Sequence, residues 1–132
     1  MSDTSNVLKP AVNFLKHYQP FVQMSTAHLE YLAMPLDQVF FSEGDNILST
    51  KQDNNDYLYI IKSGLVCSRD TNETLNPGAC FPINALIHQI NTAYYKAEKS
   101  TICYQLKYSH FEYLMQQSRS FNHFIVQNSL LD

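Results

Sequence analysis

The sequence predicts a mainly β domain, a roll or sandwich of short strands with helices at both ends. Apolar residues recur at helical spacing near both termini and alternate with polar residues in the middle of the chain. In that middle part, turn residues recur at intervals of roughly 8–14 residues. Such spacing favours a sandwich or roll over the alternating strands and helices of a parallel sheet. With 132 residues, the chain is expected to form a single domain over 1–132.

Two helices are expected before the strands, within about 5–34. The first should start late or break near Pro10, because proline disrupts a helix interior. Ser25 is the expected N-cap of the second helix, since its hydroxyl can accept a hydrogen bond from a free backbone N–H. This second helix should end before Pro35.

The β region is expected to cover about 37–107. Three turns divide it, and each contains one of the three glycines of the chain, Gly44, Gly64 and Gly78. Tight hairpin turns need positive φ, which glycine reaches without steric cost. Past the third turn the expected segments are a short helix at 83–89 and strands at 93–97 and 100–106.

Two further helices are expected within about 109–131. Ser109, with Glu112 three residues later, fits a capping box at the start of the first. Ser120 is the expected cap of the second. Aromatic residues on these helices should pack mainly against the strands, and they also suit a homodimer or interdomain contact.

Composition excludes several classes of protein. Apolar residues make up 45% of the chain and charged residues 16%, which excludes a disordered chain. The net charge of −3 gives no electrostatic reason to expect nucleic acid or an anionic membrane as a partner. No signal peptide or apolar run of about 20 residues is visible, so we expect a cytoplasmic protein. Three separated cysteines indicate reduced thiols, and the five histidines lack the spacing of metal ligands, so no metal is expected.

Three blocks of the sequence resemble cyclic-nucleotide-binding domains. Residues 41–48, FSEGDNIL, resemble the opening F-x-x-G-[DE]-x-I-[IL] of that family. Residues 57–66 resemble its Y-x-I-x-x-G-x-V segment, and residues 75–81 its L-x-x-G-x-x-F segment. The resemblance implies a β-roll with flanking helices. It also implies a regulatory or sensory module rather than an enzyme, and it leaves a cupin-like enzyme as a weaker alternative.

The resemblance further implies a ligand site, a phosphate-binding cassette after the third block. In the family, a short helix presents backbone N–H groups to the cyclic phosphate, a Glu binds the ribose and an Arg pairs with the phosphate. Here Ile83 takes the place of the Glu and Asn91 that of the Arg, and no Glu or Arg lies between 74 and 97. The candidate ligand-binding residues of this degenerate cassette are Phe81, Pro82, Ile83, Asn84, Ala85, Asn91, Thr92 and Ala93.

Loss of one charged partner in a desolvated site weakens the binding free energy by about 2–5 kcal/mol. A difference of 1.4 kcal/mol corresponds to about a tenfold change in affinity. We therefore expect no ordinary cyclic-nucleotide binding and no cofactor. The alternative is a genuine cAMP or cGMP receptor with an atypical cassette that uses backbone N–H groups with Asn91 or Thr92. A protein-interaction module without a ligand is a further alternative. The residues Phe81, Pro82, Tyr94 and Tyr95, in and beside the cassette, suit core packing, a pocket for an uncharged or aromatic effector, or a docking face.

One branch of the family resembles this chain in more detail. In those bacterial signal-transduction proteins, the domain precedes paired CBS domains and a nucleotidyltransferase domain. The similar stretches are CFPINAL at 80–86, CYQL at 103–106, and a series of aromatic residues at 111–124. The resemblance implies that downstream domains of a longer polypeptide are the partners, with a small-molecule effector as a further possibility.

Overall fold

The computed structural model describes residues 10–48, 57–69, 71–83 and 94–129. Within them, eight strands form two four-stranded sheets in which all neighbouring strands are antiparallel. The first sheet has the order β1 (Asp37–Phe41), β8 (Thr101–Lys107), β3 (Tyr57–Ser63) and β6 (Cys80–Phe81). The second has the order β2 (Asn46–Leu48), β7 (Tyr95–Ala97), β4 (Val66–Ser68) and β5 (Thr74–Leu75).

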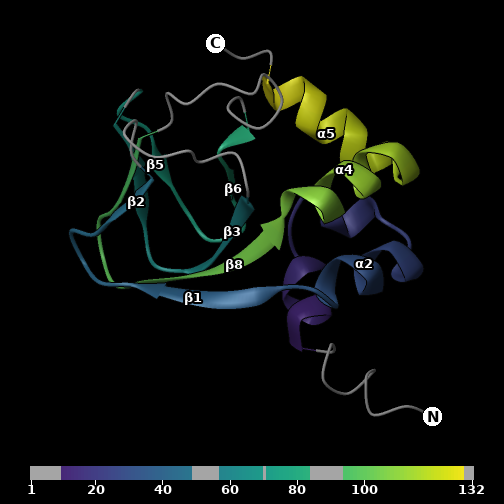
Figure 1. Cartoon of the computed structure of the whole chain (residues 1–132), viewed down its shortest axis with the longest axis horizontal. Coiled ribbons are helices and arrows are strands. Elements are labelled where there is room, and N and C mark those ends of the chain that lie inside the picture. Colours follow the sequence, from purple (N-terminus) through teal and green to yellow (C-terminus); the bar gives the residue numbers. More distant parts are fainter. Residues whose placement is uncertain (1–9, 49–56, 70, 84–93, 130–132) are drawn as a thin grey trace.

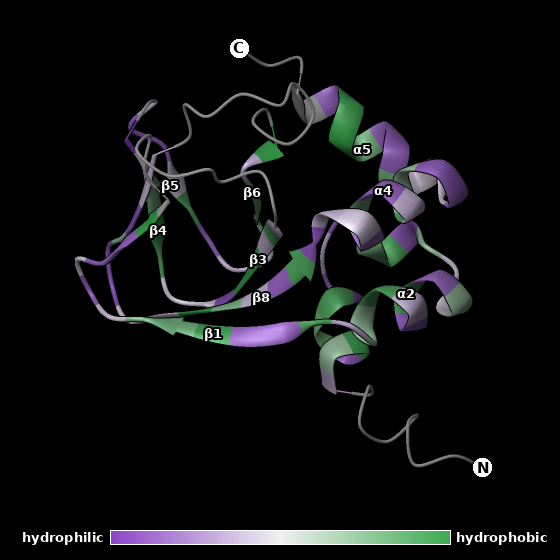
Figure 2. Ribbon diagram, viewed as in Figure 1, coloured by the Kyte–Doolittle hydropathy of each residue, from purple (hydrophilic) through white to green (hydrophobic). Residues whose placement is uncertain are grey.

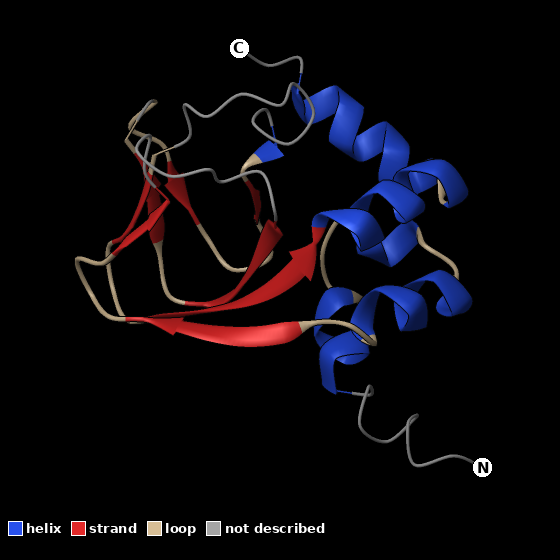
Figure 3. Cartoon of the chain, in the orientation of Figure 1, coloured by secondary structure: helices blue, strands red, loops and turns tan. Residues whose placement is uncertain are grey.

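The helices gather at one end of the roll, beside the first sheet (Figures 1 and 3). They are a helical turn at 10–15, η1 (Phe21–Gln23), α2 (Thr26–Ala33), α4 (Tyr108–Gln117) and α5 (Arg119–Ser129). The predicted fold class, a mainly β roll with flanking helices, is confirmed. None of the described helices is long and apolar enough to cross a membrane.

Side-chain alternation along β3 divides the core into two clusters. Leu58 and Ile60 pack with the helices, whereas Tyr59 and Ile61 point into the roll between the two sheets. The division follows from strand geometry, because successive side chains point to opposite faces of a sheet. The core cluster that Leu58 and Ile60 form with the helices, which we call the helical cluster, includes Phe111 from α4. Figure 2 shows hydrophobic and hydrophilic residues alternating along α5, as expected for a helix with one buried face.

Several local predictions are confirmed. The Ser25 hydroxyl accepts a hydrogen bond from the backbone N–H of His28, at 3.1 Å, and caps α2 as expected. The helix ends at Ala33, before Pro35. The three glycines all have positive φ, between 92° and 102°. The turn at Gly64 needs glycine for a second reason, because a Cβ there would come within 2.6 Å of the Ser100 carbonyl oxygen.

Both predicted caps of the C-terminal helices are wrong. Helix α4 begins at Tyr108, and its N-cap is Lys107, which makes no side-chain capping bond. Pairing with Tyr57 keeps β8 extended through Lys107, so Ser109 lies inside the helix rather than at its cap. At α5 the cap is Ser118 rather than Ser120, because the hydroxyl of Ser118 accepts from the backbone N–H of Phe121 at 3.3 Å.

Candidate functional site

The predicted cassette is described only at its beginning. Phe81 ends β6 and points into the roll, with 1% of its surface exposed. Pro82, joined to it by a cis peptide bond, is buried. Ile83, at the position of the family's Glu, is half-buried and packs against the helical cluster rather than the roll interior. The other predicted site residues, Asn84, Ala85, Asn91, Thr92 and Ala93, lie outside the described residues.

Five aromatic side chains meet inside the roll, and we call them the interior aromatic cluster: Phe41, Tyr57, Tyr59, Phe81 and Tyr95. The rings of Tyr59 and Phe81 stack, with centroids 5.3 Å apart and planes 17° from parallel. On the other side of Phe81, the ring of Tyr95 lies at 4.7 Å. Phe41 meets Tyr59 edge-on at 6.2 Å. Because the rings come from β1, β3, β6 and β7, the cluster joins the two sheets.

The polar side chains of the interior described next, Gln105 and Thr101, are neutral. Gln105 on β8 lies opposite Tyr59 on β3, and its amide nitrogen donates to the Tyr59 hydroxyl at 3.2 Å. The fully buried Thr101 donates to the backbone carbonyls of Leu65 and Lys99, at 3.1 and 2.8 Å. Hydroxyl and amide groups can bind a neutral polar ligand, whereas a phosphate is held best by charged donors.

Charged side chains lie outside the roll interior. No Lys, Arg, Asp or Glu is buried in the part of the chain that the structure describes. On β7, Tyr95 and Ala97 point into the roll, so Lys96 between them lies on the opposite face. The exposed Arg69 places its guanidinium over the ring of Tyr94, 5.3 Å from its centroid. Among the described residues, therefore, no cation from the strands is placed to neutralise a phosphate inside the roll.

The described residues include two thiols of raised pKa and no metal-binding group. The three cysteines are free thiols, and burial raises the pKa of both Cys80 and Cys103 to about 12. A thiol with so high a pKa stays protonated at neutral pH and is a poor nucleophile. No group of three His, Cys, Asp or Glu side chains that could hold a metal ion occurs among the described residues.

Sequence reasoning found part of this site. It named Phe81, and it identified Tyr95 as a residue for core packing or an altered pocket. It missed Phe41, Tyr59 and Gln105, which join Phe81 only through the pairing of distant strands. The signal available in the sequence was the alternation of Tyr57, Tyr59 and Ile61, which places these three side chains on one face of a strand.

The two antiparallel sheets with flanking helices agree with the family comparison. Residues 38–118 match the model of the cyclic nucleotide-binding domain, so the chain belongs to this family. Domains of this family are regulatory rather than catalytic. No curated protein matches the sequence.

Solved structures that resemble the chain share its fold at less than 25% identity. One is the cAMP-bound PfPKA-R, with a TM-score of 0.81, 20% identity and coverage of 96% of this chain. This chain spans only 46% of that structure's length. The sensor domain of the transcriptional regulator DNR from Pseudomonas aeruginosa has a TM-score of 0.70 and 17% identity, covering 90% of this chain and 89% of that one.

A third similar structure is the regulatory subunit of a cAMP-independent protein kinase A from Trypanosoma brucei. Its TM-score is 0.75 at 18% identity, and the match covers 96% of this chain and 53% of that one. A triple variant of that subunit, which includes a threonine-to-arginine change, is described as bound to cAMP in the A site.

Proposed function

We propose that this chain is a regulatory domain whose roll does not bind cAMP or cGMP in the usual way of its family and instead responds to an uncharged or aromatic effector. The observation that carries the proposal is the roll interior. Its inward faces hold the interior aromatic cluster and neutral polar groups, and no charged residue is buried among the described residues.

The physical argument concerns the cyclic phosphate. Transfer of its negative charge from water into an apolar interior is costly unless charged donors and hydrogen bonds compensate. The family uses an Arg for this purpose, and here the matching position is Asn91. The absent Glu and Arg would each weaken binding by about 2–5 kcal/mol. Two such losses would move a micromolar dissociation constant to millimolar or weaker.

Two of the similar structures support the proposal. The same fold occurs in a regulatory subunit described as cAMP-independent. A variant of that subunit with an added arginine is described as cAMP-bound. By the same reasoning, an arginine introduced into this chain at the position that matches the family's own should favour cyclic-nucleotide binding.

The test compares the natural chain with the double variant Ile83→Glu, Asn91→Arg by thermal unfolding and calorimetric titration with cAMP and cGMP. The natural chain should show no shift at about 1 mM nucleotide. A ligand at 100 times its dissociation constant would stabilise by about 2.7 kcal/mol, a shift of several degrees. The matched control Ile83→Gln, Asn91→Gln changes the same positions without charge.

Two outcomes decide the question. A gain of binding in the charged variant but not in its neutral control would support the proposal. A shift of several degrees in the natural chain would instead show a receptor with an atypical cassette, working through backbone N–H groups and neutral side chains.

We also propose that the domain controls attached CBS and nucleotidyltransferase domains and is not itself an enzyme. The branch resemblance at 80–86 and 111–124 supports this, together with apolar side chains left exposed on the last two helices. Tyr113 on α4 is 42% exposed and Val126 on α5 is 40% exposed. Sedimentation velocity at rising concentration tests whether the same surface forms a homodimer. Val126→Ser in a polypeptide that joins this chain to the CBS and nucleotidyltransferase domains tests interdomain control.

A further inference from the structure

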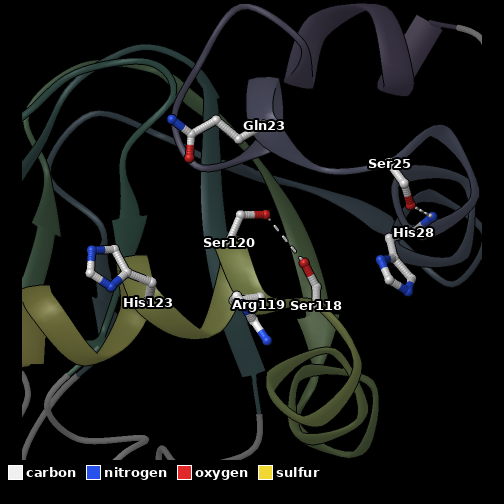
Figure 4. Close-up of a pocket in the computed structure, with 7 residues that line it drawn as sticks. All are labelled: Gln23, Ser25, His28, Ser118, Arg119, Ser120 and His123. Atoms are coloured by element: carbon white, nitrogen blue, oxygen red, sulfur yellow. Dashed lines mark hydrogen bonds between the residues drawn. The ribbon is translucent and has the colours of Figure 1, made fainter.

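A second candidate site lies in the helical part of the chain, outside the roll. A pocket of about 520 Å³ opens between the segment of η1 and α2 and the junction of α4 with α5 (Figure 4). Binding pockets for small molecules typically measure about 300–1,000 Å³, so this one is large enough for a small metabolite. It belongs neither to the cassette nor to the interior aromatic cluster.

The pocket is lined by arginine, histidine, serine and glutamine side chains. Arg119, His28 and His123 line it from two different segments of the chain, and the described lining residues include no Asp or Glu. Among the described residues, the guanidinium of Arg119 has no ion-pair or hydrogen-bond partner. An Arg side chain has five N–H donors in a geometry that matches phosphate oxygens, and each imidazole can donate a hydrogen bond.

Two helices also begin at this pocket. Ser25 caps α2 and Ser118 caps α5, and both serines line the pocket. Neither helix has an acidic residue in its first turn, so no carboxylate offsets the partial positive charge of either N-terminus. The hydroxyl of Ser120 lies 3.4 Å from that of Ser118, and either of the two can donate to the other. The pocket therefore combines a guanidinium, two imidazoles, hydroxyl groups and two positive helix ends.

We propose that this pocket binds the phosphate group of a small phosphorylated molecule. Its occupant would contact the N-terminus of α5 on one side and the N-terminus of α2 on the other. Because Ser118 is the only residue between α4 and α5, such a ligand would fix the direction in which α5 leaves the domain. The site would then act on the C-terminal helix independently of the roll, so this inference goes beyond the function proposed above.

The test is a titration of the isotopically labelled chain with inorganic phosphate, followed by the backbone amide signals of 26–28 and 118–121. Sodium chloride keeps the ionic strength constant. The natural chain should show saturable shifts with a millimolar dissociation constant. Arg119→Gln should raise that constant at least tenfold. Arg69→Gln is the matched control, since these are the two arginines of the chain and Arg69 lies over Tyr94, away from the pocket.

A repeat titration with glycerol phosphate distinguishes the two sources of the phosphate group, because tighter binding than that of inorganic phosphate indicates an organic ligand. His123→Gln is a second variant that should also weaken binding. Absence of saturable shifts, or equal effects of the two arginine variants, would overturn the proposal. Arg119 also follows the last carbonyls of α4, which favour a cation. If Arg119→Gln lowers stability while phosphate causes no shift of the amide signals, Arg119 only stabilises the C-terminal end of α4, and the proposal is wrong.

Discussion

Replacement of Phe81 by alanine would test whether the roll interior is filled by its own side chains. The ring is 1% exposed and lies between Tyr59 and Tyr95, with centroids at 5.3 and 4.7 Å. Loss of a buried phenylalanine ring costs about 3–5 kcal/mol, because transfer free energy is lost and a cavity remains. Part of this is the two aromatic pairs, worth about 0.5–1.5 kcal/mol each. For a chain of this length, the melting temperature should fall by roughly 10–20 °C.

The assay is urea unfolding followed by circular dichroism, with Phe40→Ala as the matched control. Phe40 lies on β1, but its side chain is 62% exposed, so its loss should change the free energy of unfolding by no more than about 0.5 kcal/mol. A cost below about 1 kcal/mol for Phe81→Ala would refute the reasoning. It would mean that the Phe81 ring is not packed tightly between Tyr59 and Tyr95.

Two further predictions concern the turns and the buried thiols. Gly64→Ala should destabilise the chain by about 1–3 kcal/mol more than Gly44→Ala in urea unfolding. Both residues have positive φ, but only at Gly64 would a Cβ approach backbone atoms, 2.6 Å from the Ser100 oxygen and 2.7 Å from the Thr101 Cα; equal costs would contradict this. Burial raises the pKa of Cys103 to about 12, against 9.0 for a free thiol, so above pH 9 the unfolded chain loses a proton that the folded chain keeps. This thiol should therefore lower stability by about 1.4 kcal/mol per pH unit between about pH 9 and pH 12, in addition to a similar contribution from Cys80, and Cys103→Ala should remove its share of the slope.

Local features of the fold were predictable from the sequence. The cap of α2 depends on Ser25 and a backbone N–H three residues away, and the turn at Gly64 depends on one residue's freedom at positive φ. Helix α4 was misplaced by one or two residues because its start depends on Lys107 pairing with Tyr57, fifty positions earlier in the chain. The amino-acid sequence of the helix itself does not indicate that pairing.

The candidate site was predictable only in part, for the same reason. Phe81 was found because its block resembles a family motif. Its partner Tyr59 comes from a strand that reaches it through antiparallel pairing. The helical pocket was missed altogether, because Ser25 and Arg119 come from opposite ends of the chain and each has an ordinary local role. Sites built from distant segments become visible only when the topology is known.

The direct passage from β8 into α4 has a mechanical consequence. Lys107 is both the last residue of the strand and the N-cap of the helix, so no linker absorbs motion between them. One residue inserted at this joint would turn the helix by about 100° about its axis and swing Phe111 and Leu114 out of the core. A displacement of β8 is therefore transmitted to α4 as a rigid-body rotation of the helix. The helical backbone is next interrupted at Ser118, the single residue between α4 and α5, so the orientation of α5 relative to α4 is set there.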